Sequence, residues 1–491
     1  MNLRTLGGRL ESAAARGQAR ITGRALGPYQ SAIVRIGFSF TWLLFLLREW
    51  PHRQVLYGPD SPWAPDMARQ LIDGTGSFTT LMWSDGQAWF EAVYAIAVIS
   101  SALLMLGWRT RTMSVLFMVG VLSLQNRNVF VGDGGDNIIH LMAIYLVLTR
   151  CGQVWSLDAR RAARELRSAN APTSHSFGEG SPAGAVGRVP GPRAAVESAD
   201  GGPAKRLGAF AKPGAPAHEP PRPRAEGADG HPTSPTVTAR TPGDLPGAMR
   251  RASPTDPSRH TGLLGSDGTG VVLWTLLGTT LAVVTALGKL SAGWALVFWG
   301  LWAAHAAWWA VCRYAPGEPR TVLEALGNLA HNAALVVIMG QVCLIYATAG
   351  WYKIQGTRWQ DGTAVHYPLH LDYFSPWPAL TDVLGSSGTM VMLLSYGTVF
   401  VQVAFPFALL NRRAKNVLLA VMMLEHIGIA IVLGLPFLSL AMIAADAVFL
   451  PTNFLRWLGS VIQRTRHRLR RRAPLAVGRD ARAPADRTLV G

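Results

Sequence analysis

Ten separate apolar segments dominate the sequence, and their lengths constrain what the chain can fold into. A helix needs about 20 predominantly apolar residues to cross a hydrocarbon core of about 30 Å. Nine segments cover about 31–50, 88–106, 113–125, 271–287, 294–311, 326–350, 389–410, 417–433 and 437–450, and one more surrounds His140 and ends before Arg150. The third, fourth and last in chain order are short, so we expect them to be tilted or partly buried. This pattern predicts an all-α, polytopic membrane helix bundle of about ten transmembrane helices.

The composition and the charge distribution agree with a membrane protein. Of the 491 residues, 49% are hydrophobic and only 15% are charged, which excludes an ordinary soluble globular protein. A formal net charge of +17 would suit nucleic acid, but the arginines gather in the two tails, the short loops and one long middle segment. That distribution is typical of a cytoplasmic face. We therefore expect a protein integral to the plasma membrane, with both termini cytoplasmic, a lipid bilayer as its partner and no nucleic acid.

Composition also divides the chain into five parts. The predicted parts are a basic cytoplasmic tail (1–29), a first membrane part of about four helices (30–158), a disordered cytoplasmic insert rich in Pro, Gly, Ala and Arg (159–268), a second membrane part of about six helices (269–451) and a basic cytoplasmic tail (452–491). The first tail has the pattern of neither a cleaved signal peptide nor a fold. The insert begins with a basic piece of helical pattern and then holds too few large apolar residues to offset its chain entropy.

Lys353 lies where the seventh apolar segment meets a loop rich in Trp, Tyr, Asp and His. Two interpretations are open. A lysine at the edge of a bilayer usually extends its amine to the lipid headgroups and serves as an anchor. Alternatively, apolar surroundings favour the neutral amine, which can take a proton from a substrate.

Other polar residues fall near the same predicted face of the bundle. Asp136 and His140 are four residues apart and therefore share one face of the fourth helix. Glu425 and His426 interrupt the ninth apolar segment, and ionisable groups at membrane depth usually face a cavity or a partner. A structural hydrogen bond between helices is the alternative role for this pair. The three cysteines, Cys151, Cys312 and Cys343, have neither metal-binding spacing nor the pattern of a disulfide framework, so no metal site is expected.

The stretch around Lys353 resembles a known family signature. Ala349-Gly350-Trp-Tyr-Lys353-Ile, followed by Trp359-Gln-Asp361-Gly362, is similar to the Ala-Gly-x-x-Lys-Leu and Trp-x-x-Gly motifs of vitamin K-dependent γ-glutamyl carboxylases and their bacterial HTTM (horizontally transferred transmembrane) relatives. The resemblance continues through Trp155-Ser-Leu-Asp158, the basic turn Arg109-Thr-Arg111 and His426. It covers about 31–158 and 326–451, in the same order and topology.

The resemblance implies quinol chemistry. In the carboxylase, the lysine at the place of Lys353 deprotonates reduced vitamin K, oxygen then adds, and the strong base that results removes a γ-proton from glutamate. It implies a vitamin K-like reduced quinone as cofactor and Lys353, Asp136, His140 and His426 as catalytic residues. The residues expected to bind substrate or quinol are Trp351, Tyr352, Trp359, Asp361, His366 and Glu425.

Three departures from the carboxylase accompany the resemblance. Gly134-Gly135-Asp136 stands where the carboxylase has Asn-Asn-His, and Tyr352 stands where it has a lysine. After Leu450 we expect only the basic tail, without the carboxylase's large extracytoplasmic domain. We therefore expect an HTTM-like membrane protein with an outward-facing pocket. It is either an enzyme acting on a quinol or peptide, or a non-enzymatic maturation or export partner of a secreted peptide or toxin. A transporter is a third alternative.

The predicted topology places both termini and residues 165–265 in the cytoplasm, because the arginine-rich loops all fall on one side. Single-cysteine variants treated with a membrane-impermeant thiol reagent test this. A cysteine at position 200 should stay unlabelled in intact cells and react after permeabilisation. Labelling from outside would reverse the orientation.

Overall fold

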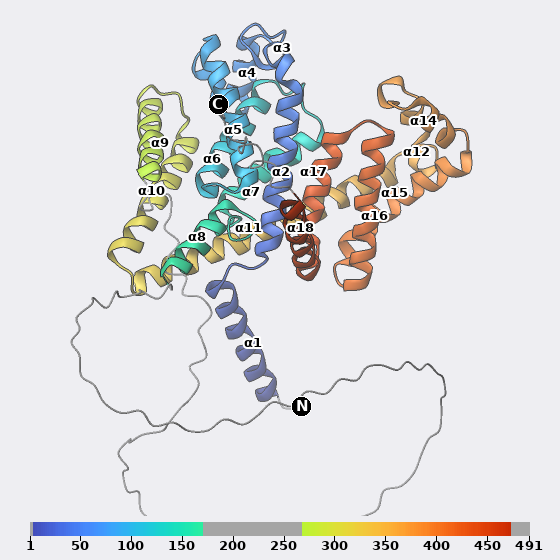
Figure 1. The fold of residues 1–491 in the computed structure, drawn as a ribbon. Helices are drawn as coiled ribbons and strands as arrows, with labels where there is room; N and C mark the ends of the chain where they lie inside the picture. The colour runs from blue at the N-terminus through green and yellow to red at the C-terminus, as the bar shows by residue number, and fades with distance from the viewer. Residues whose placement is uncertain (1–2, 170–267, 473–491) are drawn as a thin grey trace, which may run out of the picture. The chain divides into compact units, whose positions relative to one another are not determined.

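The computed structural model describes residues 3–169 and 268–472, and in these ranges every regular element is a helix (Figure 1). The apolar helices are α2 (Pro28–Glu49), α5 (Gln87–Leu106), α6 (Thr110–Arg127), α7 (Gly134–Leu148), α9 (Gly268–Ala286), α10 (Ala292–Tyr314), α11 (Glu318–Gln355), α15 (Gly388–Ala408), α16 (Arg412–Val432) and α17 (Pro436–Asp446). Each of the ten predicted segments coincides with one of them. The all-α prediction is confirmed.

Length and composition separate these ten helices into two groups. Among the described residues, seven helices are long and apolar enough to cross a membrane, or eight if α17 and α18 (Thr452–Arg472), which meet at a bend of 117°, form one span. The three apolar helices that fall short on their own are α6, α7 and α17. These are the three segments that the sequence predicts to be short.

The remaining helices are shorter or more polar. They are α1 (Leu3–Gly23), α3 (Arg53–Tyr57), α4 (Pro65–Thr75), α8 (Leu157–Ala169), α12 (Thr357–Gln360), α13 (His366–Leu369) and α14 (Pro378–Gly385), with 3-10 turns at Trp50–His52, Leu81–Trp83, Asp372–Phe374 and Ala447–Phe449. The predicted basic helical piece at the start of the insert is α8, whereas residues 170–267 of that insert lie outside the described residues.

Part of the predicted basic tail, residues 1–29, is helical: α1 packs against α11. Asparagines of α11 bind the last carbonyls of α1, which a helix end otherwise leaves without partners. Asn332 Nδ2 donates to Ile21 O at 2.8 Å, and Asn328 Nδ2 donates to Thr22 O at 2.8 Å. The predicted second tail also begins with a helix, α18.

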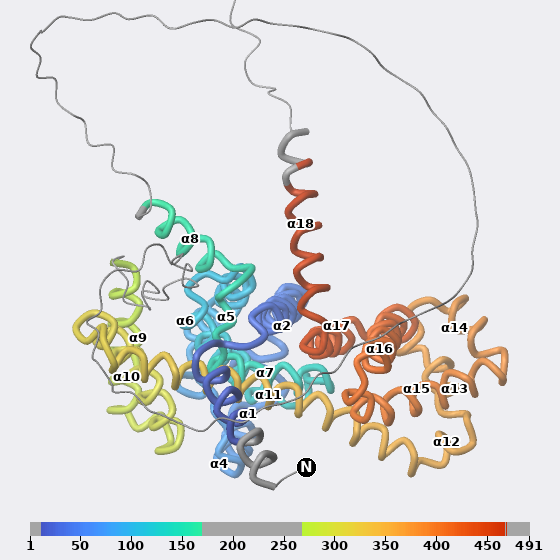
Figure 2. Tube along the Cα trace, turned by 90° about the horizontal axis from the view of Figure 1, so that it is seen from below, coloured from blue at the N-terminus to red at the C-terminus, as the bar shows by residue number. Residues whose placement is uncertain are grey.

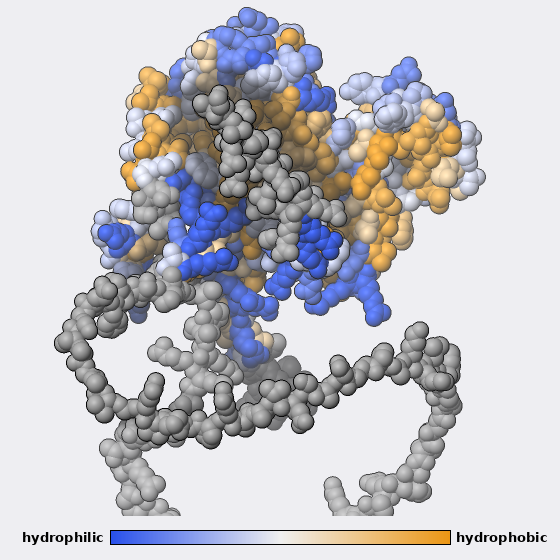
Figure 3. All heavy atoms as spheres, viewed as in Figure 1, coloured by the Kyte–Doolittle hydropathy of each residue, from blue (hydrophilic) through white to orange (hydrophobic). Residues whose placement is uncertain are grey.

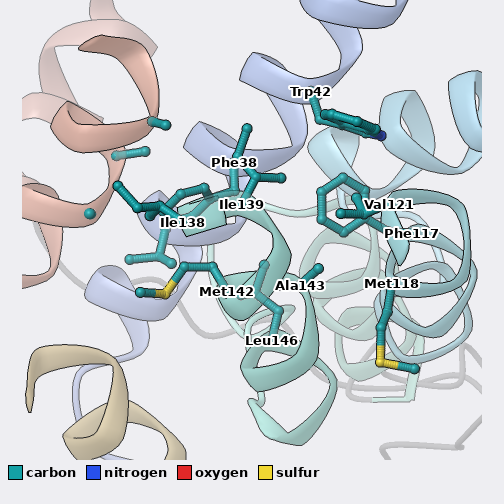
Figure 4. Packing of buried hydrophobic residues seen from close by; sticks show 14 of the residues in the cluster. Phe38, Trp42, Phe117, Met118, Val121, Ile138, Ile139, Met142, Ala143 and Leu146 are labelled. Atoms are coloured by element: carbon teal, nitrogen blue, oxygen red, sulfur yellow. The ribbon is translucent and has the colours of Figure 1, made fainter. Parts of the chain in front are cut away.

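The main core lies where α2, α6 and α7 meet (Figure 4). Phe38 and Trp42 of α2 are buried against Phe117 of α6 and Met142 of α7. Helix α17 packs against α2 and α7 on the other side, and α11 runs past this group from α10 to α12 (Figure 2). With 38 residues, α11 is about 57 Å long and therefore joins the two sides of the bundle.

Apolar side chains also cover the outside of the helices. In Figure 3 the hydrophobic residues form a band, with hydrophilic residues toward both ends of the bundle. Helices α9 and α10 pair through the stacked rings of Trp274 and Trp302, 4.1 Å apart, and bury few of their apolar side chains. Exposed apolar surface of this extent is unfavourable in water and favourable against lipid tails. The bilayer is thus the environment that these helices fit.

A buried arginine fastens the first membrane part together. Arg35 of α2 has no exposed surface, and its guanidinium donates to four backbone carbonyls. The acceptors are Leu104 O, Met105 O at 2.8 Å, Cys151 O at 3.2 Å and Trp155 O at 2.9 Å. Arg35 therefore ties α2 to the end of α5 and to the chain between α7 and α8.

Asp158, in the first turn of α8, caps the start of α6. Its carboxylate accepts from Arg109 N and Thr110 N, both at 2.8 Å, and from Thr110 Oγ1 at 2.9 Å. Arg109 has a positive φ of 43°, a rare conformation for a residue with a side chain. The neighbouring Gly107 also has a positive φ, and a Cβ there would lie 2.4 Å from Ser156 Cβ. Trp155-Ser-Leu-Asp158 and the basic turn are thus parts of one structural junction.

We expect Asp158→Ala to lower the stability of the folded protein by about 1–3 kcal/mol, because two backbone N–H groups lose their acceptor. The apparent melting temperature of the detergent-purified protein measures this. Glu165→Ala, an exposed acidic position on the same helix α8, is the matched control. Equal melting temperatures for the two variants would contradict the capping role.

Candidate functional site

Lys353 lies in the last turn of α11 and begins a chain of hydrogen bonds across three helices. Its Nζ donates to Gln402 Oε1 of α15 at 2.9 Å, and Gln402 Nε2 donates to Glu425 Oε1 of α16 at 3.0 Å. Gln402 is buried, whereas Lys353 and Glu425 are half-buried. The amine therefore stays within the bundle and is bonded to a neighbouring helix.

Trp359 covers the amine from the loop side. Residues Gly356 to Asp361 turn the chain back through the short helix α12, with Trp359 N donating to Gly356 O at 3.0 Å. The Trp359 ring centre lies 5.2 Å from Lys353 Nζ, within the range of a cation–π contact. The Trp-x-x-Gly part of the signature thus forms a wall of the lysine site.

Gly350 allows this site to form. A Cβ at position 350 would lie 2.6 Å from Val403 Cγ2 and 3.4 Å from Val403 N. Without a side chain, α11 approaches α15 closely enough for Lys353, one turn later, to reach Gln402, the residue before Val403. Small residues have this role in many membrane helix contacts.

An apolar groove adjoins the bonded chain. It lies between the end of α11 and the middle of α15, and its lining residues are Ile354, Tyr396, Val399, Phe400, Val403 and Ala404. Two of these residues are sequence neighbours of the polar chain, since Ile354 follows Lys353 and Val403 follows Gln402. The lining itself is apolar apart from the hydroxyl of Tyr396.

A second polar cluster is buried deeper between α11, α16 and α17. Tyr346 Oη donates to Asp446 Oδ1 at 2.9 Å and lies 3.0 Å from His426 Nε2. All three side chains are buried, and Asp446 has no exposed surface. His426 follows Glu425 in α16, so the two clusters meet at this pair.

The predicted pair Asp136 and His140 has other partners. Asp136 forms a capping box with Asp133 at the start of α7: its Oδ2 accepts from Asp133 N at 2.9 Å. His140 Nδ1 lies 3.0 Å from Gln125 Oε1 of α6, and Gln125 Nε2 donates to Asp136 O at 2.9 Å. These bonds fix the α6–α7 connection, and none of them joins the lysine site.

The other predicted binding residues lie on the outside of the site. Trp351 and Tyr352 of α11 are exposed, and the rings of His366 and His370 are tilted by 38° with their centroids 4.0 Å apart. Hydrogen bonds from the Thr363 side chain and backbone lower the pKa of Asp361. The same hydrogen bonds hold the loop in a turn. Of the predicted residues, the structure therefore groups Lys353 with Trp359, Glu425 and His426.

Sequence reasoning missed Gln402 and Asp446 and gave Tyr346 no role. Each is a polar residue in an apolar segment, which is the signal that drew attention to Glu425 and His426. Tyr346 also precedes Lys353 by seven residues, two helical turns, and so lies on the same face of α11. Across residues 3–169 and 268–472, no group of three His, Cys, Asp or Glu side chains could hold a metal ion.

Comparisons with protein-family models, with curated proteins and with solved structures find no match to this chain. The case for function therefore depends on the geometry of the site.

Substituting Gly350 tests how the site is assembled. We expect Gly350→Ala to lower the melting temperature, because overpacking against Val403 costs about 1–3 kcal/mol. Gly340→Ala is the matched control on the same helix, since a Cβ there meets no atom within 4 Å. Adding Val403→Ala to Gly350→Ala should restore stability. If Gly350→Ala and Gly340→Ala have the same melting temperature, the close approach of α11 to α15 does not stabilise the bundle.

Proposed function

We propose that this chain is an HTTM-like integral membrane protein that binds a reduced, lipid-soluble quinone in the groove beside Lys353, and that Lys353 Nζ accepts a proton from it. The observation that carries the proposal is the bonded chain Lys353–Gln402–Glu425 at the edge of an apolar groove. The same proposal places the protein in the plasma membrane with cytoplasmic termini.

The groove has the chemistry that a quinol needs. Its apolar lining suits a ring with an isoprenoid tail, which reaches the groove sideways from the bilayer. A reduced quinone would supply an acidic hydroxyl and, once deprotonated, a carbanion-like ring that reacts with oxygen. Lys353 precedes the lining residue Ile354 and supplies the basic atom, Nζ, which the Trp359 ring shields from the loop side.

Gln402 orients the lysine as a base. A neutral amine donates one N–H to Gln402 Oε1 and keeps its lone pair for a substrate proton. The other end of the amide donates to Glu425, which prevents Gln402 from rotating away. Once Lys353 has taken a proton, the Gln402 oxygen and the carboxylate of Glu425 stabilise the ammonium.

An exposed aromatic surface favours the second candidate, a maturation or export partner of a secreted peptide. Tyr373 and Trp377, in the loop before α14, are 87% and 62% exposed. Aromatic side chains are frequent anchors for bound peptides. A neighbouring gene for a small secreted peptide would favour this candidate, whereas a quinone that co-purifies with the protein would favour the first.

Substitution of Lys353 separates a base from an anchor. Arginine also reaches lipid headgroups, but it stays protonated at all accessible pH values. We expect Lys353→Arg and Lys353→Ala to slow consumption of a reduced, isoprenoid-tailed naphthoquinone by about 100-fold or more while both variants fold. Absorbance of the quinone in proteoliposomes measures the rate.

The matched control is Lys289→Arg, at the exposed turn between α9 and α10. A Lys353→Arg variant as active as the wild type would leave Lys353 as a boundary anchor.

A further inference from the structure

The side chains of Tyr346, His426 and Asp446 form a polar cluster that is buried inside the bundle. These side chains are at most 6% exposed and come from α11, α16 and α17. The rings of Phe405 and Tyr346 meet edge to face at 5.7 Å and close one side. A carboxylate at membrane depth is costly to keep, and such residues commonly take part in proton movement.

The hydrogen bonds favour one tautomer of His426. The Tyr346 hydroxyl has a single hydrogen, which it donates to Asp446 Oδ1. The contact between Tyr346 Oη and His426 Nε2 then requires the hydrogen on Nε2. The other ring nitrogen, Nδ1, consequently carries a lone pair. It is buried and has no hydrogen-bond partner among the described residues.

Charged and titratable groups surround this nitrogen on each neighbouring helix. Glu425 is adjacent on α16, Asp446 comes from α17, and α11 contributes Tyr346 and, about 10 Å further along its axis, Lys353. Helix α15 contributes the uncharged Gln402. The lysine site and the buried cluster therefore share helices α11 and α16.

We propose that His426 Nδ1 is a proton-binding site inside the membrane, next to an ionised Asp446. A proton from solution forms an N–H bond at Nδ1, and no electrons are transferred. The positive imidazolium is balanced by Asp446 through the Tyr346 hydroxyl.

Protonation of His426 needs no substrate, so this proposal does not depend on the proposed function. The substrate-free protein with ¹⁵N-labelled histidine can therefore be titrated by NMR, with the His426 signal assigned through His426→Gln. His331 is an internal control, because both of its ring nitrogens are bonded: Nδ1 accepts from Arg150 N at 2.9 Å and Nε2 donates to Leu26 O at 2.8 Å.

We expect His426 to be neutral with hydrogen on Nε2 near pH 7, and to gain a proton on Nδ1 as the solution is acidified, while His331 stays neutral. Asp446→Asn should lower the ratio of protonated to neutral His426 about tenfold at a given pH, because the balancing charge is lost. Tyr346→Phe should also lower this ratio of protonated to neutral His426. Lys353→Ala should leave Nδ1 able to bind a proton.

A His426 that stays neutral together with His331 in the folded wild-type protein would overturn the proposal, whatever the variants do. If His426 titrates unchanged in folded Asp446→Asn, Asp446 is not the group that balances the imidazolium charge. If Lys353→Arg remains fully active while His426 titrates as expected, the proposed function fails and the proton site stands.

Discussion

The burial of the Arg35 guanidinium is the constraint on which the first half of the bundle depends. A cation at membrane depth is costly unless its donors find acceptors. Every nitrogen of this guanidinium donates to a backbone carbonyl, and the acceptors lie on the end of α5 and on the chain between α7 and α8. Helix ends leave carbonyls without partners, so the same hydrogen bonds satisfy both the buried guanidinium and the free carbonyls at the end of α5. The junction with Asp158 then sets where α6 begins.

This junction determines where the functional side chains lie, although it is not part of the site. Helix α2, which carries Arg35, packs closely against α17: a Cβ on Gly37 would lie 2.5 Å from Ala444 Cβ. Ala444 is two residues before Asp446, so this contact fixes the depth of the buried carboxylate. Tyr346 and His426 then meet Asp446 from α11 and α16. The scaffold thus positions the second cluster from the side opposite the groove.

The sequence predicts the helices well because crossing a bilayer demands a long apolar run, which is a local signal. The same signal identified α6, α7 and α17 as short. Contacts between distant segments are not local, and this is why Gln402 and Asp446 were not linked to Lys353. Helix α1 was missed for a related reason: its end is stabilised by Asn328 and Asn332, more than 300 residues away in the chain. Lys353 itself was found because it interrupts an apolar segment at its end.

Buried polar side chains also show how structural and functional polar groups differ inside a membrane protein. Arg35 and His331 have a partner for every nitrogen, and any change of protonation would break a bond that holds two segments together. His426 has a partner on one ring nitrogen, whereas the other is buried without a hydrogen-bond partner among the described residues. Leaving such an atom without a partner lowers stability by about 1–3 kcal/mol. This cost falls on a nitrogen in the same cluster as the buried carboxylate of Asp446, and that is the arrangement on which the proposed proton site rests.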